Sequence, residues 1–232
     1  MGISVIIPIG ENDESWRNLI DDLSFLSSND EVVFSTGKRQ IAEIESAFTD
    51  KKVVFRTRFV ENSMGRARQM NAAVKVSAYG YLWFLHCDSR IPMGAFAKLK
   101  NIESLDLDDI HFFSLKFLAD GPRQMAVNTV GVWFRSQVLK IPFGDQAFFM
   151  KKSVFQELGG FNEEAPYGED HLLVWKAHRN KIKIRNVGSF IYTSARKYRS
   201  EGWSKTTSSH LILTVRQALP EIWKIIRTKE KP

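Results

Sequence analysis

Short apolar runs alternate with helical patterns in the first part of the chain. Residues 4–8 form a β-branched run that is stopped by proline, which predicts a buried strand. Apolar residues then fall at i, i+3, i+4 and i+7 in Trp16, Leu19, Ile20 and Leu23, as in an amphipathic helix. The pattern continues as a strand over 31–35, a helix over 40–48 and a strand over 52–56. This alternation predicts a parallel sheet with crossover helices.

The middle of the chain contains the most apolar strand. Ser63 is predicted to cap a helix that runs through Ala78. Residues 81–85 are apolar throughout, which predicts a central strand covered on both faces. Further helices are predicted over 93–102, 124–138, 153–158 and 170–180, and further strands over 110–118, 148–150 and 182–187. Gly159 and Gly160 indicate a turn with positive φ or a close approach of the backbone.

An apolar stripe recurs near the end of the sequence. Its members are Leu211, Val215, Leu219, Ile222 and Ile226, at the spacing of one helix face. Such a stripe either packs on its own domain or lies at a membrane or subunit interface, and the sequence leaves both possibilities open.

Composition narrows the class of protein. The 232 residues are 44% hydrophobic and 25% charged, with no internal repeat or low-complexity linker, which favours one globular domain. No apolar run approaches the roughly 20 residues of a membrane span. The first residues lack the basic start of a signal peptide, and the lone Cys87 excludes an internal disulfide, so we expect a cytoplasmic protein.

The net charge of +7 is unevenly distributed. Residues 171–232 carry 14 Lys and Arg against 3 Asp and Glu, whereas residues 1–170 carry 19 against 23. A basic end on a mildly acidic body favours one of three partners: nucleic acid, a membrane surface or a phosphate-bearing ligand.

Asp88 is the most informative single residue, because it comes just after the apolar strand. Open α/β sheets bind ligands at the carboxyl ends of their strands. A carboxylate there could hold a divalent cation that clamps phosphates, or it could simply form a turn. His86 and Cys87 stand beside it, but no spaced Cys or His completes a zinc site.

A second acidic pair, Glu169 and Asp170, opens a predicted helix. One of these carboxylates could be a general base for a hydroxyl nucleophile, and the alternative is an ordinary helix cap. The sequence has neither a Gly-x-x-x-x-Gly-Lys loop nor a Gly-x-Ser-x-Gly turn, so phosphate-loop NTPases and α/β-hydrolases lack their motifs.

Basic residues accompany these carboxylates. Arg66 and Arg68 lie near a helix start, where a guanidinium group could meet a phosphate or a base, although Arg68 fits a solvated helix face better. Residues 194–199 with Trp203 combine basic and aromatic groups, which could neutralise a diphosphate, bind nucleic acid or form an ordinary basic surface.

Taken in order, these segments resemble the family 2 glycosyltransferases of the GT-A fold, in particular a short soluble subgroup, over about residues 3–205. The matching segments are residues 4–8, 65–71, 85–92, 144–146, 155–161, 168–170 and 194–203. The resemblance implies an α/β fold with a mixed, mostly parallel sheet flanked by helices. It also implies an inverting transfer of a sugar from a nucleotide-diphosphate donor to a hydroxyl acceptor, which is a sugar, a lipid or a small molecule.

The resemblance also assigns roles residue by residue. Asp170 is expected to be the catalytic base beside Glu169, and Asp88 to hold Mg²⁺ or Mn²⁺ on the donor diphosphate. The acceptor side is expected to include Asp145, Gln146 and Arg90. The donor nucleotide is expected to contact Pro8, Gly10, Ser35, Arg66, Arg196, Arg199 and Trp203.

Two departures from the family pattern motivate an alternative. Ser35 stands where the family has an acidic residue after the second strand, and Arg90 replaces the second Asp of the Asp-x-Asp motif. The chain could therefore be a nucleotide-binding module without activity.

The single domain is expected to divide into a nucleotide-binding half over about 1–120, an acceptor half over about 121–205 and a basic amphipathic helix over 206–232. Binding to nucleic acid or to a membrane surface through this basic end is a further alternative. We expect no nucleic acid partner. The sequence leaves open whether this helix makes peripheral contact with the inner face of the membrane.

Overall fold

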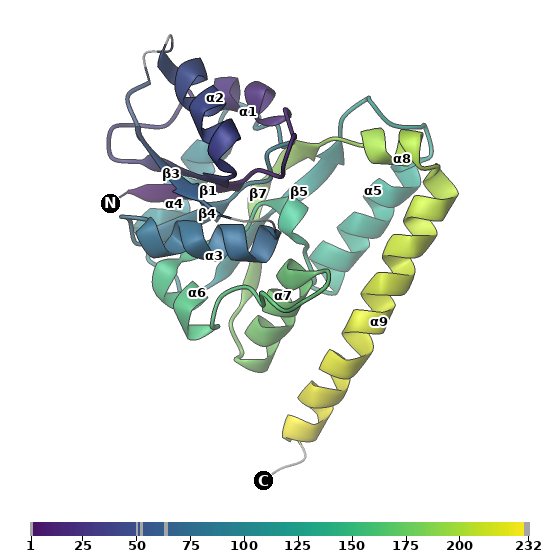
Figure 1. The fold of residues 1–232 in the computed structure, drawn as a ribbon. Helices are drawn as coiled ribbons and strands as arrows, with labels where there is room; N and C mark the ends of the chain where they lie inside the picture. Colours follow the sequence, from purple (N-terminus) through teal and green to yellow (C-terminus); the bar gives the residue numbers. More distant parts are fainter. Residues whose placement is uncertain (1, 50, 52, 63–64, 230–232) are drawn as a thin grey trace.

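A seven-stranded mixed sheet forms the centre of the protein in the computed structural model, which describes residues 2–49, 51, 53–62 and 65–229 (Figure 1). Its strands are β1 (Ile3–Pro8), β2 (Glu31–Thr36), β3 (Arg56–Glu61), β4 (Tyr81–Phe84), β5 (Ile110–Phe117), β6 (Phe149–Lys151) and β7 (Ile184–Thr193). They lie in the order β3-β2-β1-β4-β6-β5-β7. Only β6 among these strands runs opposite to its neighbours. The predicted mixed, mostly parallel sheet is confirmed.

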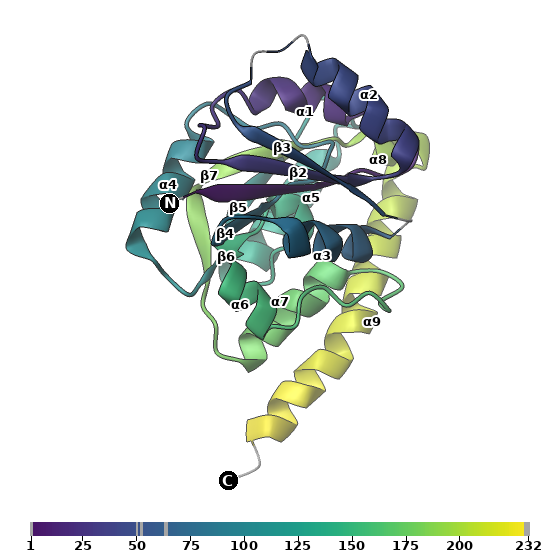
Figure 2. The same cartoon turned by 60° about the vertical axis from the view of Figure 1, so that its left-hand side comes forward.

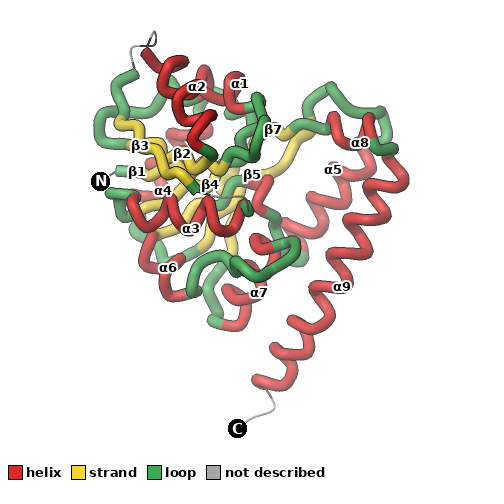
Figure 3. The backbone as a smooth tube through the Cα atoms, in the orientation of Figure 1, coloured by secondary structure: helices red, strands yellow, loops and turns green. Residues whose placement is uncertain are grey.

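Helices cover both faces of this sheet, as Figures 2 and 3 show. The α-helices are α1 (Trp16–Asp22), α2 (Lys38–Thr49), α3 (Arg66–Val76), α4 (Ala95–Leu105), α5 (Met125–Trp133), α6 (Lys152–Glu157), α7 (Glu169–Arg179), α8 (Arg196–Ser200) and α9 (Trp203–Lys229). Side chains of α1, α2 and α4 pack in one core cluster, and those of α3, α6 and α7 pack in the other.

The central strand β4 belongs to both cores. Tyr81 and Trp83 pack on one side of the sheet, and Leu82 and Phe84 pack on the other. Because successive side chains of a strand point to opposite faces, a strand covered on both faces must be apolar throughout. The apolar run from the sequence therefore marks the middle of the sheet.

Two predicted elements are wrong in their extent. The strand predicted over 52–56 is instead Arg56–Glu61, an edge strand whose side chains are mostly exposed or half-buried. The apolar signal before it comes from Phe55, which precedes β3 and is not part of its hydrogen-bonded pairing with β2. The ring of Phe55 packs edge-on against Phe48, with ring centroids 6.1 Å apart. An edge strand needs few apolar residues, so its pattern was weak.

The helix predicted over 124–138 changes character at Phe134, where a π-helical turn (Phe134–Val138) follows α5. The hydroxyl of Ser136 donates a hydrogen bond to the carbonyl of Val132, 2.8 Å away. A hydroxyl that bonds back into the helix competes with the backbone ladder and loosens it. Periodicity alone does not reveal such a turn.

Other boundaries shift by a few residues. The helix predicted from Ser63 begins at Arg66, after Gly65 with a φ of 123°, and Ser63 itself lies outside the described residues. Gly159 and Gly160 have the predicted positive φ, at 72° and 68°. Within the described ranges, no helix is both long enough and apolar enough to cross a bilayer.

Candidate active site

The predicted site segments meet at one edge of the sheet. The carboxyl ends of β1, β4, β5 and β7 lie at this edge because these strands run in the same direction. β6 runs the other way, so the 3₁₀ turn Gly144–Gln146 that precedes it lies at the same edge. Segments that are far apart in the sequence therefore become neighbours at this edge, because the parallel strands all end there.

Two of the cavities at this edge are lined by predicted site residues. The first has a volume of about 330 Å³ and is lined by Pro8, Gly10, Glu11, Asp13, Gly65, Arg66, Gln69, His86, Cys87 and Asp88. The second has a volume of about 540 Å³, and its lining includes Phe117, Phe143, Asp145, Tyr167, Asp170, Lys197, Tyr198 and Gln217. Arg66, His86 and Asp88 line both cavities, so the two spaces adjoin at these three side chains.

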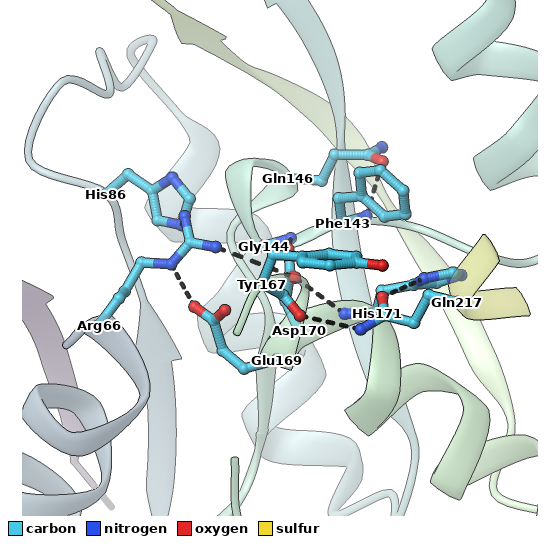
Figure 4. Close-up of polar contacts among 10 residues, drawn as sticks. All are labelled: Arg66, His86, Phe143, Gly144, Gln146, Tyr167, Glu169, Asp170, His171 and Gln217. Atoms are coloured by element: carbon cyan, nitrogen blue, oxygen red, sulfur yellow. Dashed lines mark hydrogen bonds and ion pairs between the residues drawn. The ribbon is translucent and has the colours of Figure 1, made fainter. Parts of the chain in front are cut away.

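Arg66 lies at the centre of this junction (Figure 4). Its guanidinium pairs with the carboxylate of Glu169 and lies 4.0 Å from Asp170 and 3.4 Å from Nε2 of His86. Burial alone would lower the pKa of Arg66, but Asp170 and Glu169 outweigh it and raise that pKa. Burial and the charge of Arg66 lower the pKa of His86, so the imidazole is neutral and accepts from Arg66.

Asp170 is held by the backbone at the start of α7. Its two oxygens accept hydrogen bonds from the N–H groups of Gly144 and His171, the latter at 2.9 Å. Burial would raise its pKa, but Arg66 and these two N–H groups outweigh burial and lower the pKa. Asp170 is therefore an oriented, ionised carboxylate at neutral pH. A carboxylate has about four lone-pair sites, so Asp170 can still accept a further proton donor.

Asp145 is the second carboxylate of this cavity, and its environment differs from that of Asp170. Its Oδ1 is buried and has no hydrogen-bond partner within the described part of the chain. Burial raises its pKa to about 6, with the charge of Asp170 adding to the rise and Arg135 opposing it. Asp145 thus lines the second cavity, while its unpartnered Oδ1 is itself buried.

Asp88 lies half-buried in both cavities and shares the first cavity with Asp13. Burial, followed by the charge of Asp13, raises the pKa of Asp88. Asp13 lies in the loop after β1, and Arg196 reaches it at 3.6 Å. The described residues contain no cluster of three or more His, Cys, Asp or Glu that could hold a metal ion. Magnesium in phosphate sites often uses one or two carboxylates plus phosphate oxygens and water, so Asp88 with Asp13 fits such an ion.

Some predicted site residues lie in the cavities. Pro8 and Gly10 line the first cavity, Arg66 and Asp88 line both, and Arg196 reaches the loop of the first through the hydroxyl of Ser15, at 2.6 Å. Asp145 and Asp170 line the second cavity, with Glu169 bound to Arg66 beside them. Seven of the predicted site residues therefore lie at the two adjoining cavities, and Arg196 lies at their margin.

Arg90 is placed elsewhere. Its guanidinium makes two hydrogen bonds with Asp22 of α1, at 2.6 and 2.8 Å, and its backbone pairs with Tyr192. The residue does not line either cavity. Its expected substrate contact is therefore not retained, and its charge serves to tie α1 to β7.

Gln146 is fully buried and its side chain is occupied. The amide donates to the carbonyl of Phe113 at 2.9 Å and accepts from the backbone N–H of Phe143 at 3.2 Å. Such bonds hold the turn that carries Gly144 and Asp145. Gln146 therefore supports the acceptor-side turn from within, whereas the sequence assigned it a direct contact.

The aromatic and basic residues after β7 also separate. Trp203 donates to Asn128 of α5 at 2.6 Å, and Arg199 donates to the carbonyl of Gly121 at 3.2 Å. Neither lines a cavity, whereas Lys197 and Tyr198 do. Ser35 is fully buried with no partner for its hydroxyl among the described residues, and it lines neither cavity.

A chain of hydrogen bonds that the sequence did not reveal forms one wall of the second cavity. Trp175 donates to Nε2 of His171 at 2.7 Å, so Nδ1 carries the proton and donates to Gln217 of α9, also at 2.7 Å. Gln217 in turn donates to the carbonyl of Tyr167 at 2.9 Å. The only sequence signal for this chain of hydrogen bonds was that His171 follows Asp170. Its partner Gln217 lies 46 residues further along the sequence, in α9, so no local pattern links the two.

Crystal structures of TarS from S. aureus share this fold. The structure of its residues 1–349 aligns with a TM-score of 0.60 and 18% identity over 84% of this chain and 60% of that chain. The same protein in complex with UDP-GlcNAc aligns with a TM-score of 0.60 over 58% of that chain, and its complex with UDP gives the same score.

This chain therefore spans 58–60% of the TarS chains of residues 1–349 and 37% of the longer TarS chain that it matches. At 18% identity the likeness establishes the fold alone, and it confirms the predicted GT-A fold. No family model matches the sequence. No curated protein matches it either.

Proposed function

We propose that this protein transfers a sugar from a nucleotide-diphosphate donor to a hydroxyl acceptor, with inversion at the anomeric carbon. The observation that carries this proposal is the junction of two cavities at Arg66, His86 and Asp88. Transfer between two substrates needs a donor space and an acceptor space that adjoin at the reacting groups. Asp170 on the acceptor side has the position of a base that faces this junction.

The first cavity is assigned to the donor. Every residue that lines it precedes position 89, which supports the proposed nucleotide-binding half over about 1–120. Gln69 of α3 donates to the carbonyl of Ile9 at 2.8 Å and holds the loop after β1 against this cavity. TarS has been crystallised with UDP-GlcNAc and with UDP, which supports a nucleotide sugar as the class of donor here.

The second cavity is assigned to the acceptor. Residues of the 121–205 segment supply most of its lining, together with α9. Tyr198, Phe117 and Phe143 give it apolar and aromatic walls, while Asp88, Asp145 and Asp170 give it three carboxylates. Aromatic walls with few convergent polar groups suit a carbohydrate-like hydroxyl acceptor.

A metal ion, Mg²⁺ or Mn²⁺, fits between the donor and the protein at Asp88, with Asp13 next to it. Such an ion neutralises charge on a diphosphate leaving group. Arg66 and Arg196 provide permanent positive charge near the same place. The proposed leaving-group site therefore combines one or two carboxylates with two guanidinium groups.

The reaction follows from these positions. Asp170 accepts the proton of the acceptor hydroxyl, and the hydroxyl oxygen forms a bond to the anomeric carbon of the donor. The bond between that carbon and the diphosphate oxygen breaks, and its electron pair leaves with the diphosphate. One displacement from the opposite side inverts the configuration. Glu169 acts through Arg66, whose guanidinium it positions.

The alternative is a nucleotide-binding module without activity. It rests on Arg90, which is bound to Asp22 and supplies no group to the donor cavity, and on Ser35, which is buried outside that cavity. Nucleotide binding without metal dependence and without turnover would favour this alternative.

The proposed function is tested by incubating the protein with Mn²⁺, a panel of nucleotide sugars and hydroxyl acceptors, and by determining the product anomer by NMR. We expect transfer with inversion. Asp170→Asn should lower kcat by about 10²–10⁴-fold, the usual contribution of a general base. Asp108→Asn, at an exposed carboxylate distant from the site, is the matched control. A wild-type protein that neither turns over any donor nor binds a nucleoside diphosphate contradicts the proposal.

A further inference from the structure

Exposed apolar side chains are concentrated on one part of the surface. Among the described residues, all large exposed hydrophobic side chains except Val54, Val76, Met93 and Leu105 belong to α5, the residues just after it, and α9. We call this set the α5–α9 face. It consists of Val127, Val130, Trp133, Phe134, Val138, Leu139, Leu211, Ile212, Val215, Leu219, Ile222, Trp223 and Ile226. The exposed fractions of these residues run from 39% to 67%. An apolar stripe that packs on its own domain would instead be largely buried.

The two helices form one outward layer. They run side by side along one flank of the protein (Figure 1), and Trp203 of α9 donates to Asn128 of α5 at 2.6 Å. Met125 of α5 and Thr206 and Glu221 of α9 are buried, so each helix turns that side toward the body. The apolar stripes lie on the opposite sides and therefore face outward together.

The rim of this face is basic. Lys205, Arg216 and Arg227 are exposed and follow one another at intervals of 11 residues, which is about three helical turns, so they form a row along one edge of the stripe. They form no ion pair within the part of the chain that the structure describes. The α9 sequence contains one acidic residue, Glu221, which is 5% exposed and pairs with Arg179 and Lys224.

We propose that the α5–α9 face binds the surface of an anionic lipid bilayer. A bilayer surface accepts both features at once, because apolar side chains enter the acyl boundary while Lys and Arg meet anionic headgroups. Trp133 and Trp223, both more than half exposed, suit the interface between headgroups and acyl chains.

A second copy of the chain or a nucleic acid would match only the apolar centre or only the basic edge of the α5–α9 face. A symmetric second copy that packs with its α9 antiparallel would bring the row of Lys205, Arg216 and Arg227 close to its own counterpart, where like charges repel. Nucleic acid binds chiefly through phosphate contacts to basic residues, so it would leave the apolar centre of the face in water.

The same helix connects this face to the site. Leu213, Thr214 and Gln217 on the inner side of α9 line the second cavity. A docked protein therefore holds that cavity about 10 Å from the lipid surface, the diameter of one helix. Membrane binding by this face does not depend on which reaction the cavity performs.

The test is co-sedimentation of the full chain with vesicles of phosphatidylcholine alone and with vesicles that contain roughly one-third phosphatidylglycerol. We expect binding to the anionic vesicles that is at least about tenfold stronger than to neutral ones and that weakens with salt. Two variants probe the two features: Ile222→Ser with Trp223→Ser, and Arg216→Glu with Arg227→Glu. Each pair should lower the partition coefficient by about tenfold or more.

Matched controls change exposed residues elsewhere on the surface. Val54→Ser with Leu105→Ser, and Lys38→Glu with Arg39→Glu, should leave binding within about twofold. Thermal melts confirm that each variant is folded, and the charge reversals at exposed positions keep the test informative if the apolar pair destabilises the chain.

Four results overturn the proposal. One is an absence of binding to anionic vesicles, and another is binding that neither face variant weakens. The third is a dimer in light scattering that the apolar pair dissociates, because a second copy then covers the face. Salt-sensitive binding to RNA or DNA that persists in the Ile222→Ser and Trp223→Ser variant, without vesicle binding, assigns the basic row to nucleic acid and likewise overturns it.

Discussion

The guanidinium of Arg66 pairs with the carboxylate of Glu169, although the two residues are 103 positions apart in the sequence. Arg66 opens α3 and Glu169 opens α7, so this ion pair joins two helix starts on the same face of the sheet. Glu169 is 8% exposed and Arg66 is 41% exposed at the side chain. A partly desolvated pair of this kind fixes the guanidinium between the two cavities.

Replacement of Arg66 by Met should affect both stability and the pH dependence of the site. Glu169 and Asp170 lose their shared cation, which we expect to cost about 1–2 kcal/mol because Arg66 is partly solvated. Because Arg66 lowers the pKa of Asp170, its loss raises that pKa. The acidic limb of the kcat profile should therefore move to higher pH.

Arg68→Met is the control on the same helix, because Arg68 is exposed and its nearest carboxylate is 3.5 Å away on Glu164. It should change the free energy of unfolding by less than about 0.5 kcal/mol. Equal destabilisation by the two substitutions would contradict the central position of Arg66.

Asp145→Asn should change how stability depends on pH. Burial raises the pKa of Asp145 to about 6 in the folded state, above the ordinary value of about 4 for an aspartate. The folded state thus holds the proton more tightly than the unfolded state, and the stability of the wild type falls as pH rises from about 4 to about 6. Asn carries no charge, so the variant lacks this fall and should gain about 3 kcal/mol relative to wild type by pH 7. Urea denaturation at several pH values measures the difference, and a difference independent of pH between 4 and 7 contradicts the raised pKa.

Asp88→Asn should remove metal-dependent binding of a nucleoside diphosphate. The amide is a neutral and weaker ligand for Mg²⁺ or Mn²⁺ than the carboxylate, and only Asp13 would remain beside it. Titration calorimetry with UDP in the presence and absence of Mn²⁺ should show at least about a tenfold weaker metal-dependent affinity. Asp108→Asn, an exposed carboxylate bound to Lys151, is the control and should bind like wild type. Metal dependence that survives in the Asp88 variant would place the ion elsewhere.

The central elements of the fold were predictable because their signal is local. The wholly apolar run that became β4 needed only the rule that a strand covered on both faces is apolar on both. The edge strand β3 was misplaced because its side chains face solvent and its register comes from pairing with β2. The outward orientation of the α9 stripe was not predictable either, since an amphipathic pattern does not say what covers it.

The site was predictable as far as strand ends determine it. Asp88 and Asp170 could be named because one follows a strand and the other opens a helix. Arg90 and Gln146 could not be placed, because their partners Asp22 and Phe113 are 68 and 33 residues away. Asp13 was not among the predicted site residues, and only the folded chain brings it into the same cavity as Asp88.

Gln146→Leu should destabilise the protein while leaving the shape of the core nearly unchanged. Leu fills a similar volume, but it leaves the carbonyl of Phe113 and the N–H of Phe143 without their partner in a fully buried place. Each unsatisfied buried group costs about 1–3 kcal/mol, so we expect a loss of about 2–4 kcal/mol. Gln156→Leu, at an exposed position of α6, should change the free energy of unfolding by less than about 0.5 kcal/mol. A neutral effect of Gln146→Leu in urea denaturation contradicts the supporting role of this amide.

Gly168→Ala should detach α9 from the start of α7. Gly168 has a φ of 62°, and a Cβ there would lie 2.3 Å from Oε1 of Gln217. Gln217 cannot move aside without losing its bonds to His171 and Tyr167, so strain and lost hydrogen bonds together should cost about 2–4 kcal/mol. Gly188→Ala is the matched control, since Gly188 has a φ of 76° with no atom within 4 Å of the added Cβ, and should show only the strain of about 1–2 kcal/mol. Urea denaturation measures both losses. Equal losses would mean that the contact with Gln217 contributes nothing, whereas a larger loss for Gly168→Ala that disappears in a Gln217→Ala background confirms the clash.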